Sequence, residues 1–321
     1  MNIRVGIVTV TYNSAAVLQP FLASVRAQLG ISVTLYAVDN DSSDDSVDLI
    51  ESWDSGDVAR VVIRSGANLG VAEGNNLGIR QALADGVDWV LLLNNDTEFE
   101  PTMIADLVEA AASTSASIVT PMIEGDDPPG SLWFGAGVLH PWQGYRATHV
   151  GAGLPFPAIS EDSPVTRPTA YAPTCALLVA PDVFAAVGLM DPSYFVYFDD
   201  VDFCIRARRA GWAYQVASHV RLLHKAGSVT GKDRGAFTAR WGIRNWVLVA
   251  RRHATSPVQR AVSLLYIQAH LLAGSVRARD PFWRIRLRER AYLEGLRTAR
   301  ESRDIPGASA GEVVSRPGPI R

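Results

Sequence analysis

The chain has 321 residues, of which 48% are hydrophobic and 20% charged, and its formal net charge is −3. This is the composition of a soluble globular protein with ample material for a core. Two cysteines, Cys175 and Cys204, exclude a disulfide framework and a cysteine-based zinc site, which indicates a reducing compartment.

The N-terminal residues Met1–Val5 lack the apolar segment of a signal peptide and lead directly into a strand-like run. No uninterrupted apolar run reaches the ~20 residues that cross a bilayer as a helix. We therefore expect a cytoplasmic protein, either free or peripheral on the inner face of the cell membrane.

Four short apolar, β-branched runs are typical of buried parallel strands, and they alternate with segments of helical spacing. The runs span residues 5–10, 33–38, 59–63 and 89–93. Strand–helix alternation predicts a doubly wound α/β unit, and ligands bind such sheets beyond the carboxyl ends of the strands. All four runs end in clusters of Asp, Asn, Thr or Gly. One polar strand end usually marks only a turn, but four at one sheet edge predict a site.

The third run leads to a glycine-rich segment, Gly66–Gly78. Its spacing is neither the dinucleotide fingerprint nor a Walker loop. Glycines let a backbone approach a ligand closely, and asparagine amides can donate and accept hydrogen bonds. A glycine-rich loop leading into a helix, without a ligand, is the alternative interpretation.

Further along, the pattern predicts a helix over 101–112 and a strand over 118–120, then a hairpin and long loops over 125–168 with scattered aromatic residues. These aromatic residues suit either sugar faces or local packing. A buried strand over 174–179 and a helix from Pro181 to Gly188 follow. Two more strands are expected, over 214–216 and 220–223, the second ending at His224.

The most unusual segment is Tyr197–Cys204, in which three acids (Asp199, Asp200 and Asp202) lie between apolar and aromatic neighbours. Burying unpaired charge is costly, so a core strand is excluded. A helix from Val201 to Ala210 is predicted, with Asp199 or Asp200 as its cap. At least one acid is then left to point into a site; an over-capped surface helix is the alternative.

The C-terminal part predicts apolar helices over 237–253 and 257–276, followed by a basic, aromatic helix from Phe282. Eight arginines occur between residues 277 and 300, at positions 277, 279, 284, 286, 288, 290, 297 and 300. This pattern suits an anionic membrane surface. A solvated charged face packed on the main domain explains it as well, whereas the absence of a nucleic-acid motif argues against nucleic acid.

Together, the strand ends resemble those of the inverting family 2 glycosyltransferases with a GT-A fold, in particular rhamnosyltransferase-like members that elongate bacterial surface polysaccharides. The motifs that carry the resemblance occur in order between residues 3 and 228: Thr9–Asn13, Val38–Ser43, Asn68–Gly78, Leu92–Thr97, Phe198–Asp202 with Arg206 and Gly211–Trp212, and His224.

This resemblance implies a role for each matching residue. Thr9, Tyr12 and Asp39 would hold the base and ribose, whereas Asn68, Gly70, Asn75 and Asn95 would line the nucleotide and diphosphate. Asp96 and His224 would bind a divalent cation, Mn²⁺ or Mg²⁺, and Asp200 would be the catalytic base. The metal motif reads Asn94–Asn95–Asp96, so an amide replaces its first acid and fewer charges hold the metal.

The resemblance implies sugar transfer, with a rhamnosyl group as first choice, from a dTDP- or UDP-sugar to a hydroxyl of a glycan or lipid-linked acceptor. A galactofuranosyl or N-acetylhexosaminyl donor fits the same motifs. A non-catalytic sugar-nucleotide-binding scaffold subunit is the alternative from another class. Residues 1–230 are expected to form the GT-A domain, split near residue 122 into nucleotide-binding and acceptor halves; residues 231–303 form a helical extension and residues 304–321 a disordered tail.

Overall fold

The computed structural model describes residues 3–157, 165–225 and 234–301. Its strands are β1 (Arg4–Thr11), β2 (Ser32–Asp39), β3 (Ala59–Arg64), β4 (Trp89–Leu93), β5 (Thr97–Phe99), β6 (Ile118–Asp126), β7 (Pro129–Phe134), β8 (Gly137–His140), β9 (Arg146–His149), β10 (Thr166–Thr169), β11 (Ala176–Val179) and β12 (Tyr214–His224). The α-helices are α1 (Ala15–Arg26), α2 (Ser46–Ser52), α3 (Gly70–Ala84), α4 (Met103–Thr114), α5 (Pro181–Val187), α6 (Asp199–Arg209), α7 (Arg234–His253), α8 (Pro257–Ala278) and α9 (Phe282–Glu301), with short 3₁₀ turns η1 (Pro141–Gln143) and η2 (Pro192–Tyr194). The predicted disordered tail lies outside the described residues.

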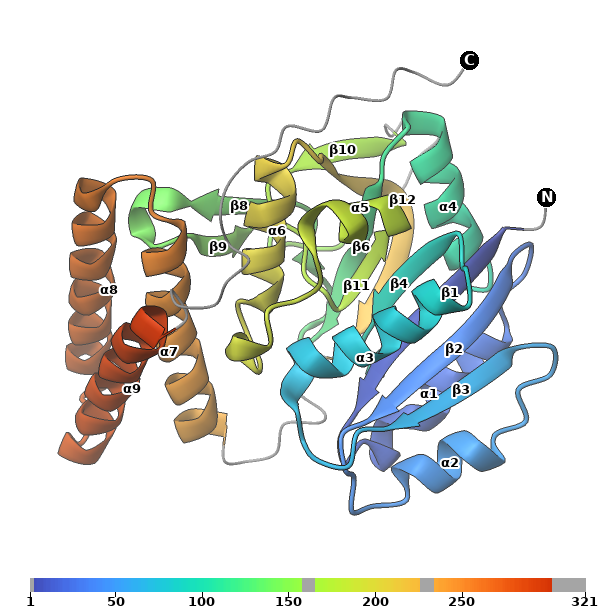
Figure 1. Ribbon diagram of the computed structural model, residues 1–321, viewed down its shortest axis with the longest axis horizontal. Helices are drawn as coiled ribbons and strands as arrows, with labels where there is room; N and C mark the ends of the chain where they lie inside the picture. Colours follow the sequence, from blue (N-terminus) through green and yellow to red (C-terminus); the bar gives the residue numbers. More distant parts are fainter. Residues whose placement is uncertain (1–2, 158–164, 226–233, 302–321) are drawn as a thin grey trace.

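Most of the described strands form one large mixed sheet with the order β3-β2-β1-β4-β11-β6-β12-β10, to which β5 and β7 add by pairing with β12 and β6 (Figure 1). Strands β8 and β9 form a separate two-stranded sheet. Strands β3, β2, β1 and β4 are parallel, β11 is antiparallel to its neighbours, and β6 and β12 run parallel to each other. The carboxyl ends of β1, β2, β4 and β12 therefore meet at one edge of the sheet. The four predicted parallel strands are confirmed here, and so is the predicted α/β architecture.

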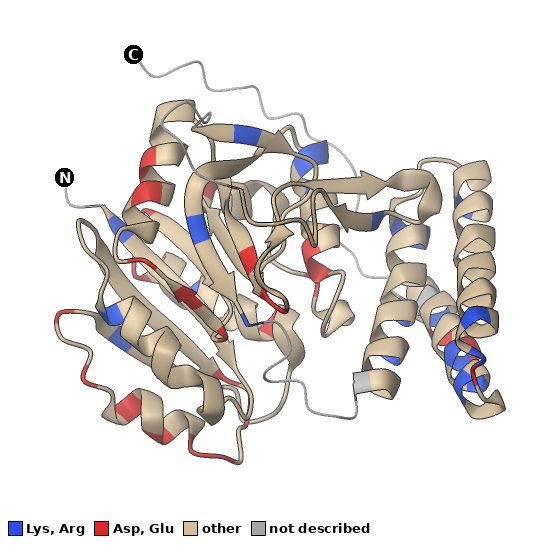
Figure 2. Cartoon of the chain, turned by 180° about the vertical axis from the view of Figure 1, so that it is seen from behind, with Lys and Arg blue, Asp and Glu red and all other residues tan. Residues whose placement is uncertain are grey.

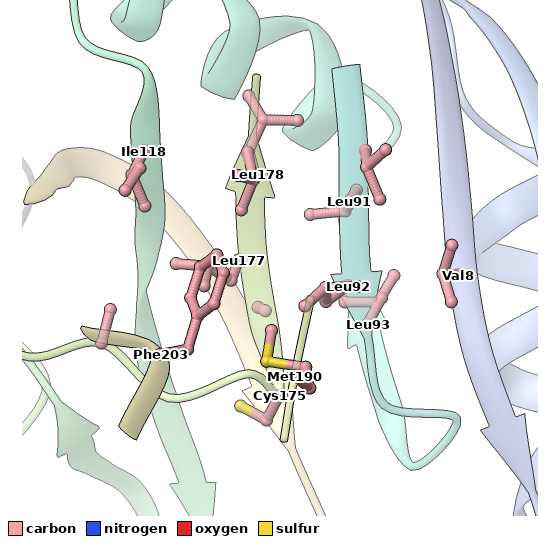
Figure 3. Packing of buried hydrophobic residues seen from close by; sticks show 14 of the residues in the cluster. Val8, Leu91, Leu92, Leu93, Ile118, Cys175, Leu177, Leu178, Met190 and Phe203 are labelled. Atoms are coloured by element: carbon pink, nitrogen blue, oxygen red, sulfur yellow. The ribbon is translucent and has the colours of Figure 1, made fainter. Parts of the chain in front are cut away.

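The core lies where helices cover the central strands. Residues Leu91–Leu93 of β4 and Leu177–Val179 of β11 are almost fully buried. Both strands are covered on their two faces, which explains why their sequences are uninterrupted apolar runs. Figure 3 shows these strands together with Phe203, the buried side chain through which α6 joins the cluster. The sheet thus gives α6, with its acidic start, a rigid support.

Most of the glycine-rich segment is helical rather than a loop, because α3 begins at Gly70. A Cβ at Gly74 would lie 2.8 Å from a methyl group of Val10, and one at Gly78 would overlap Val8. These two glycines therefore let α3 pack closely on β1. Close helix–strand packing explains them without any approach of the backbone to a ligand.

The two strands expected over 214–216 and 220–223 are one strand, β12, with a shift in its pairing to β6 between Ala217 and Arg221. The polar residues that suggested a break between two strands lie at this shift in pairing. It also lets β12 reach the sheet edge, where His224 pairs with Thr97 of β5.

Helices α7, α8 and α9 stand at the end of the molecule opposite α2 and β3 (Figure 1). They confirm the predicted C-terminal helices, and α7 packs extensively on α9. Among the described residues, no helix is both long enough and apolar enough to cross a bilayer.

Candidate active site

The sheet edge brings together residues that lie far apart in the sequence. Asp96 follows β4, His224 ends β12 and Asp200 lies in the first turn of α6. The pairing of β5 with β12 aligns Thr97 with His224, which places Asp96 beside the histidine. Two predicted metal ligands thus meet in space although 128 positions separate them in the sequence.

The Asp96–His224 pair has free coordinating atoms. Nε2 of His224 lies 3.2 Å from Oδ1 of Asp96, and both side chains are at most 10% exposed. This carboxylate oxygen and Nδ1 of His224 have no hydrogen-bond partner among the described residues. A buried carboxylate oxygen without a partner suits a cation.

The described residues contain no group of three or more His, Cys, Asp or Glu side chains placed to hold a metal. Asp96 and His224 therefore fit a divalent cation only if a substrate supplies further oxygens. Mg²⁺ and Mn²⁺ commonly bind in this way, through one or two protein ligands and phosphate oxygens.

A row of aromatic side chains joins the metal pair to Asp200. The Trp133 ring lies 5.0 Å from the His224 ring and 4.6 Å from His149, between centroids, and His149 stacks on Tyr171 at 5.8 Å. The Tyr171 hydroxyl donates a 2.5 Å hydrogen bond to Oδ2 of Asp200. Tyr171 was missed from the sequence because the contact spans 29 positions.

The three acids of α6 have different environments. Asp199 and Asp202 are buried, whereas Asp200 retains partial exposure. Burial raises the pKa of Asp200 from its ordinary value, although the hydrogen bonds from Tyr171 and from the Val201 backbone oppose the increase. Burial, assisted by the charge of Asp200, also raises the pKa of Asp199, whose Oδ2 has no hydrogen-bond partner among the described residues. Of the three acids, only Asp200 is both partly accessible and held in place by hydrogen bonds.

The prediction that Asp199 or Asp200 caps α6 was wrong. The N-cap residue is Phe198, in a left-handed conformation, and no side chain caps the helix. Asp199 and Asp200 instead belong to the first turn, where the helix dipole favours negative charge.

The contacts of Asp202 indicate a structural role. It accepts 2.7 Å hydrogen bonds from Nε of Arg206 and from His253 of α7, and a longer one from Tyr194. Burial alone would raise the pKa of Asp202, but the hydrogen bond from His253 and the charge of Arg206 outweigh it and hold the pKa below its ordinary value. This carboxylate joins α6 to α7.

Helix α7 also holds the loop that precedes α6. The buried amide nitrogen of Asn245 lies within 2.7–2.9 Å of the backbone oxygens of Tyr194, Val196 and Tyr197. Within this loop Phe195, Tyr197 and Phe198 all have positive φ, which is uncommon for aromatic residues and requires support from the surrounding structure. The sequence offered one indication of this role, because Asn245 is an amide inside a strongly apolar helix.

The predicted base and ribose residues lie at the ends of β1 and β2. Thr9 is buried, and its hydroxyl has no hydrogen-bond partner among the described residues. The carboxylate of Asp39 accepts from the Ser42 backbone, and Tyr12 is 44% exposed. Of the three side chains, Tyr12 is exposed whereas Thr9 and Asp39 are buried, and their roles in nucleotide binding remain predictions.

The four predicted diphosphate-lining residues have contacts of their own. The exposed Asn68 accepts from the backbone of Gly70, and Asn75 is buried in α3. Gly70 has a φ of +80° and lies against Phe195, so close packing already requires glycine there. The amide of Asn95 donates to the Val10 carbonyl and thereby ties β4 to β1. Binding by these four residues remains a prediction.

Residues 6–155 match the family model described as Glycosyl transferase family 2. The chain carries a family 2 glycosyltransferase domain. This domain covers β1 to β4 and the strands that follow as far as β9, and it contains Asp96, one of the two predicted metal ligands.

Curated relatives of the glycosyltransferase are similar over 54% to 84% of its length. The N-acetylglucosaminyl-diphospho-decaprenol L-rhamnosyltransferase of Mycobacterium tuberculosis is 27% identical over 302 residues, which cover 84% of this chain and 92% of the relative. Other relatives are named as a hexosyltransferase and a galactofuranosyltransferase. The matched domain and these named relatives together support a glycosyltransferase enzyme of the hexosyltransferase class.

Solved structures show the GT-A fold. The S. aureus TarS 1–349 complex with UDP matches with a TM-score of 0.58 at 12% identity, covering 94% of this chain and 82% of that chain. The mannosyltransferase PcManGT from Pyrobaculum calidifontis, solved with GDP-Man and Mn²⁺, has a TM-score of 0.55 at 14% identity and covers 95% and 89%. The predicted fold is therefore confirmed.

Proposed function

We propose that this glycosyltransferase moves a sugar, with rhamnose as first choice, from a dTDP- or UDP-sugar to a hydroxyl of a lipid-linked glycan, with inversion. The observation that carries the proposal is Asp200, a partly accessible carboxylate bound to Tyr171 at the same sheet edge as Asp96 and His224. The rhamnosyl group and the lipid-linked acceptor follow the name of the mycobacterial relative, an N-acetylglucosaminyl-diphospho-decaprenol L-rhamnosyltransferase.

Asp200 acts as the general base in this proposal. An acceptor hydroxyl must lose its proton as its oxygen attacks the anomeric carbon, and a positioned base typically contributes ~10²–10⁴-fold. The Tyr171 hydroxyl and the Val201 N–H each bind one carboxylate oxygen, so they orient Asp200 and favour its charged form. One base and direct attack opposite the leaving group give inversion without a covalent sugar–enzyme intermediate.

Asp96 and His224 are the proposed ligands for Mn²⁺ or Mg²⁺, with diphosphate oxygens completing the coordination. A bound divalent cation would neutralise the negative charge that develops on the departing nucleoside diphosphate. The imidazole ligand favours Mn²⁺ over Mg²⁺.

We expect dTDP or UDP to raise the melting temperature of the protein, and Mn²⁺ to increase that shift. A ligand at one hundred times its Kd stabilises the folded state by ~2.7 kcal/mol, which a thermal-shift assay detects readily. Asp96→Asn and His224→Ala should each remove the Mn²⁺-dependent part of the shift, because each deletes one of two protein ligands.

Asp126→Asn is the control for these variants, because Asp126 is an exposed acid at the end of the neighbouring strand β6. It should retain the full Mn²⁺ effect. No shift with any nucleotide in the wild-type protein would instead favour a scaffold subunit that does not bind a donor.

Tyr171→Phe should move the acidic limb of the kcat/KM profile to higher pH. The tyrosine hydrogen bond lowers the pKa of Asp200, so its loss raises that pKa and the base stays protonated to a higher pH. At pH values above the limb, transfer should change much less. Initial rates measured across the pH range test this.

The matched control is Tyr145→Phe, which removes a buried hydroxyl that donates to the His253 carbonyl and makes no contact with Asp200. Its acidic limb should coincide with that of the wild type. An unshifted limb in Tyr171→Phe would mean that the 2.5 Å contact does not tune the base.

A further inference from the structure

One face of α8 is apolar, exposed and without a partner among the described residues. Its exposed side chains include Val258, Val262, Leu265, Leu272 and Val276. Successive residues of this set are four, three, seven and four positions apart, and these spacings place them on one side of the helix. Leu265 is 65% exposed and Val276 is 78% exposed. A stripe of this length is more than the scattered single apolar residues of an ordinary surface.

The opposite face of α8 is already used. Ile267 is fully buried there, the Ser263 hydroxyl donates to the Pro141 carbonyl, and Tyr266 packs against Trp246 of α7. The apolar stripe is therefore not needed to hold the helix on the protein. Between Pro257 and Val276 of α8, no exposed residue is Asp, Glu, Lys or Arg, and the exposed Arg277 follows in the last turn of the helix.

The stripe ends at a basic, aromatic corner formed by the α8–α9 turn. Phe282 is 69% exposed and Trp283 is 59% exposed, directly after the stripe. Arg286 lies 5.0 Å from the Phe282 ring, and Arg284 lies 5.2 Å from the Trp283 ring. Exposed arginines at 277, 279 and 290 surround this corner. Figure 2 shows the basic segments gathered along α9.

We propose that the α8 stripe and the α8–α9 corner form a docking surface for an anionic lipid bilayer. Aliphatic side chains would enter the headgroup–acyl boundary, the two aromatic rings would lie at the interface, and the arginines would meet lipid phosphates. An anionic surface complements the excess of arginine, whereas a second copy would bring the same cationic corner. This extends the proposed function, because a lipid-linked acceptor resides in a membrane, but its evidence is separate.

The test uses the full chain and sedimentation with vesicles of phosphatidylcholine, with and without 30% phosphatidylglycerol. We expect binding to the anionic vesicles that weakens as salt increases. Leu265→Glu should weaken it by at least about tenfold, because it puts a charge into the apolar stripe. Arg277→Gln combined with Arg279→Gln should also weaken it by about tenfold and reduce the salt dependence.

Leu29→Glu is the matched control, because Leu29 is 62% exposed and lies after α1, far from α8 in the sequence. It should bind vesicles as the wild type does. An unchanged melting temperature in each variant verifies folding. Equal binding by Leu265→Glu and the wild type, or no binding of the wild type to anionic vesicles, would overturn the proposal.

A self-associating surface is distinguished by sedimentation velocity without lipid. A dimer that Leu265→Glu dissociates, with no vesicle binding, would assign the stripe to a second copy and overturn the lipid surface. The thermal shift with dTDP or UDP separates the two proposals: vesicle binding without any nucleotide shift leaves the docking surface standing and removes the proposed transferase donor. A nucleotide shift without vesicle binding supports donor binding and overturns the docking surface.

Discussion

Asp200→Asn should reduce sugar transfer by ~10²–10⁴-fold while leaving nucleotide binding unchanged. The amide keeps the shape of the carboxylate. Its one oxygen can accept from the Val201 backbone and its NH2 group can donate to the Tyr171 oxygen, but it cannot take a proton from the acceptor. Transfer is measured as nucleoside diphosphate released in the presence of acceptor, and binding as the thermal shift with Mn²⁺.

Asp199→Asn makes the same chemical change one position earlier and is the matched control. Burial raises the pKa of Asp199, so an uncharged amide resembles the state that burial favours. Transfer by this variant should stay within tenfold of the wild type. If Asp199→Asn lost transfer and Asp200→Asn kept it, the base would have to be reassigned.

Asp202→Ala should lower the free energy of unfolding by about 3–5 kcal/mol, since it leaves buried partners without their carboxylate. Arg206 and His253 both lie 2.7 Å from this group, whose side chain is only 3% exposed. Urea unfolding followed by circular dichroism measures the difference. Asp57→Ala, at an exposed loop position, should change the unfolding free energy by less than about 0.5 kcal/mol.

The pH dependence gives this prediction a second readout. The folded-state pKa of Asp202 lies below its ordinary value, so its stabilising effect is complete above that value and is lost as the pH falls below it. The difference between wild type and Asp202→Ala should therefore shrink below about pH 4. A difference that stays constant down to pH 2 would mean that the ion pairs do not account for the stability.

Local patterns were enough to predict the strand ends. The apolar runs before Asp39 and Asp96 have the length of buried strands, and parallel strands bring their carboxyl ends to one edge. The closeness of Asp96 and His224 was expected only through the family resemblance. The structure confirms that the two are adjacent, because β12 pairs with β5.

Contacts between distant segments could not be predicted in this way. Tyr171 reaches Asp200 across 29 positions and Asn245 reaches the preceding loop across about 50, and neither contact leaves a periodic signal. The break expected within β12 had a local reason, because Ser218 and His219 interrupt the apolar run. The sheet tolerates them through a shift in pairing.

The support that α7 gives to the loop before α6 has a consequence for synthesis of the protein. The chain leaves the ribosome from its N-terminus, so the strands and α6 emerge before Asn245 and His253. Until α7 emerges, the left-handed loop residues and the Asp202 carboxylate lack their partners. A nascent chain that ends before α7 therefore holds the described strands of the sheet but an unfinished loop before α6, and this loop gains its partners only after the residues up to His253 have emerged.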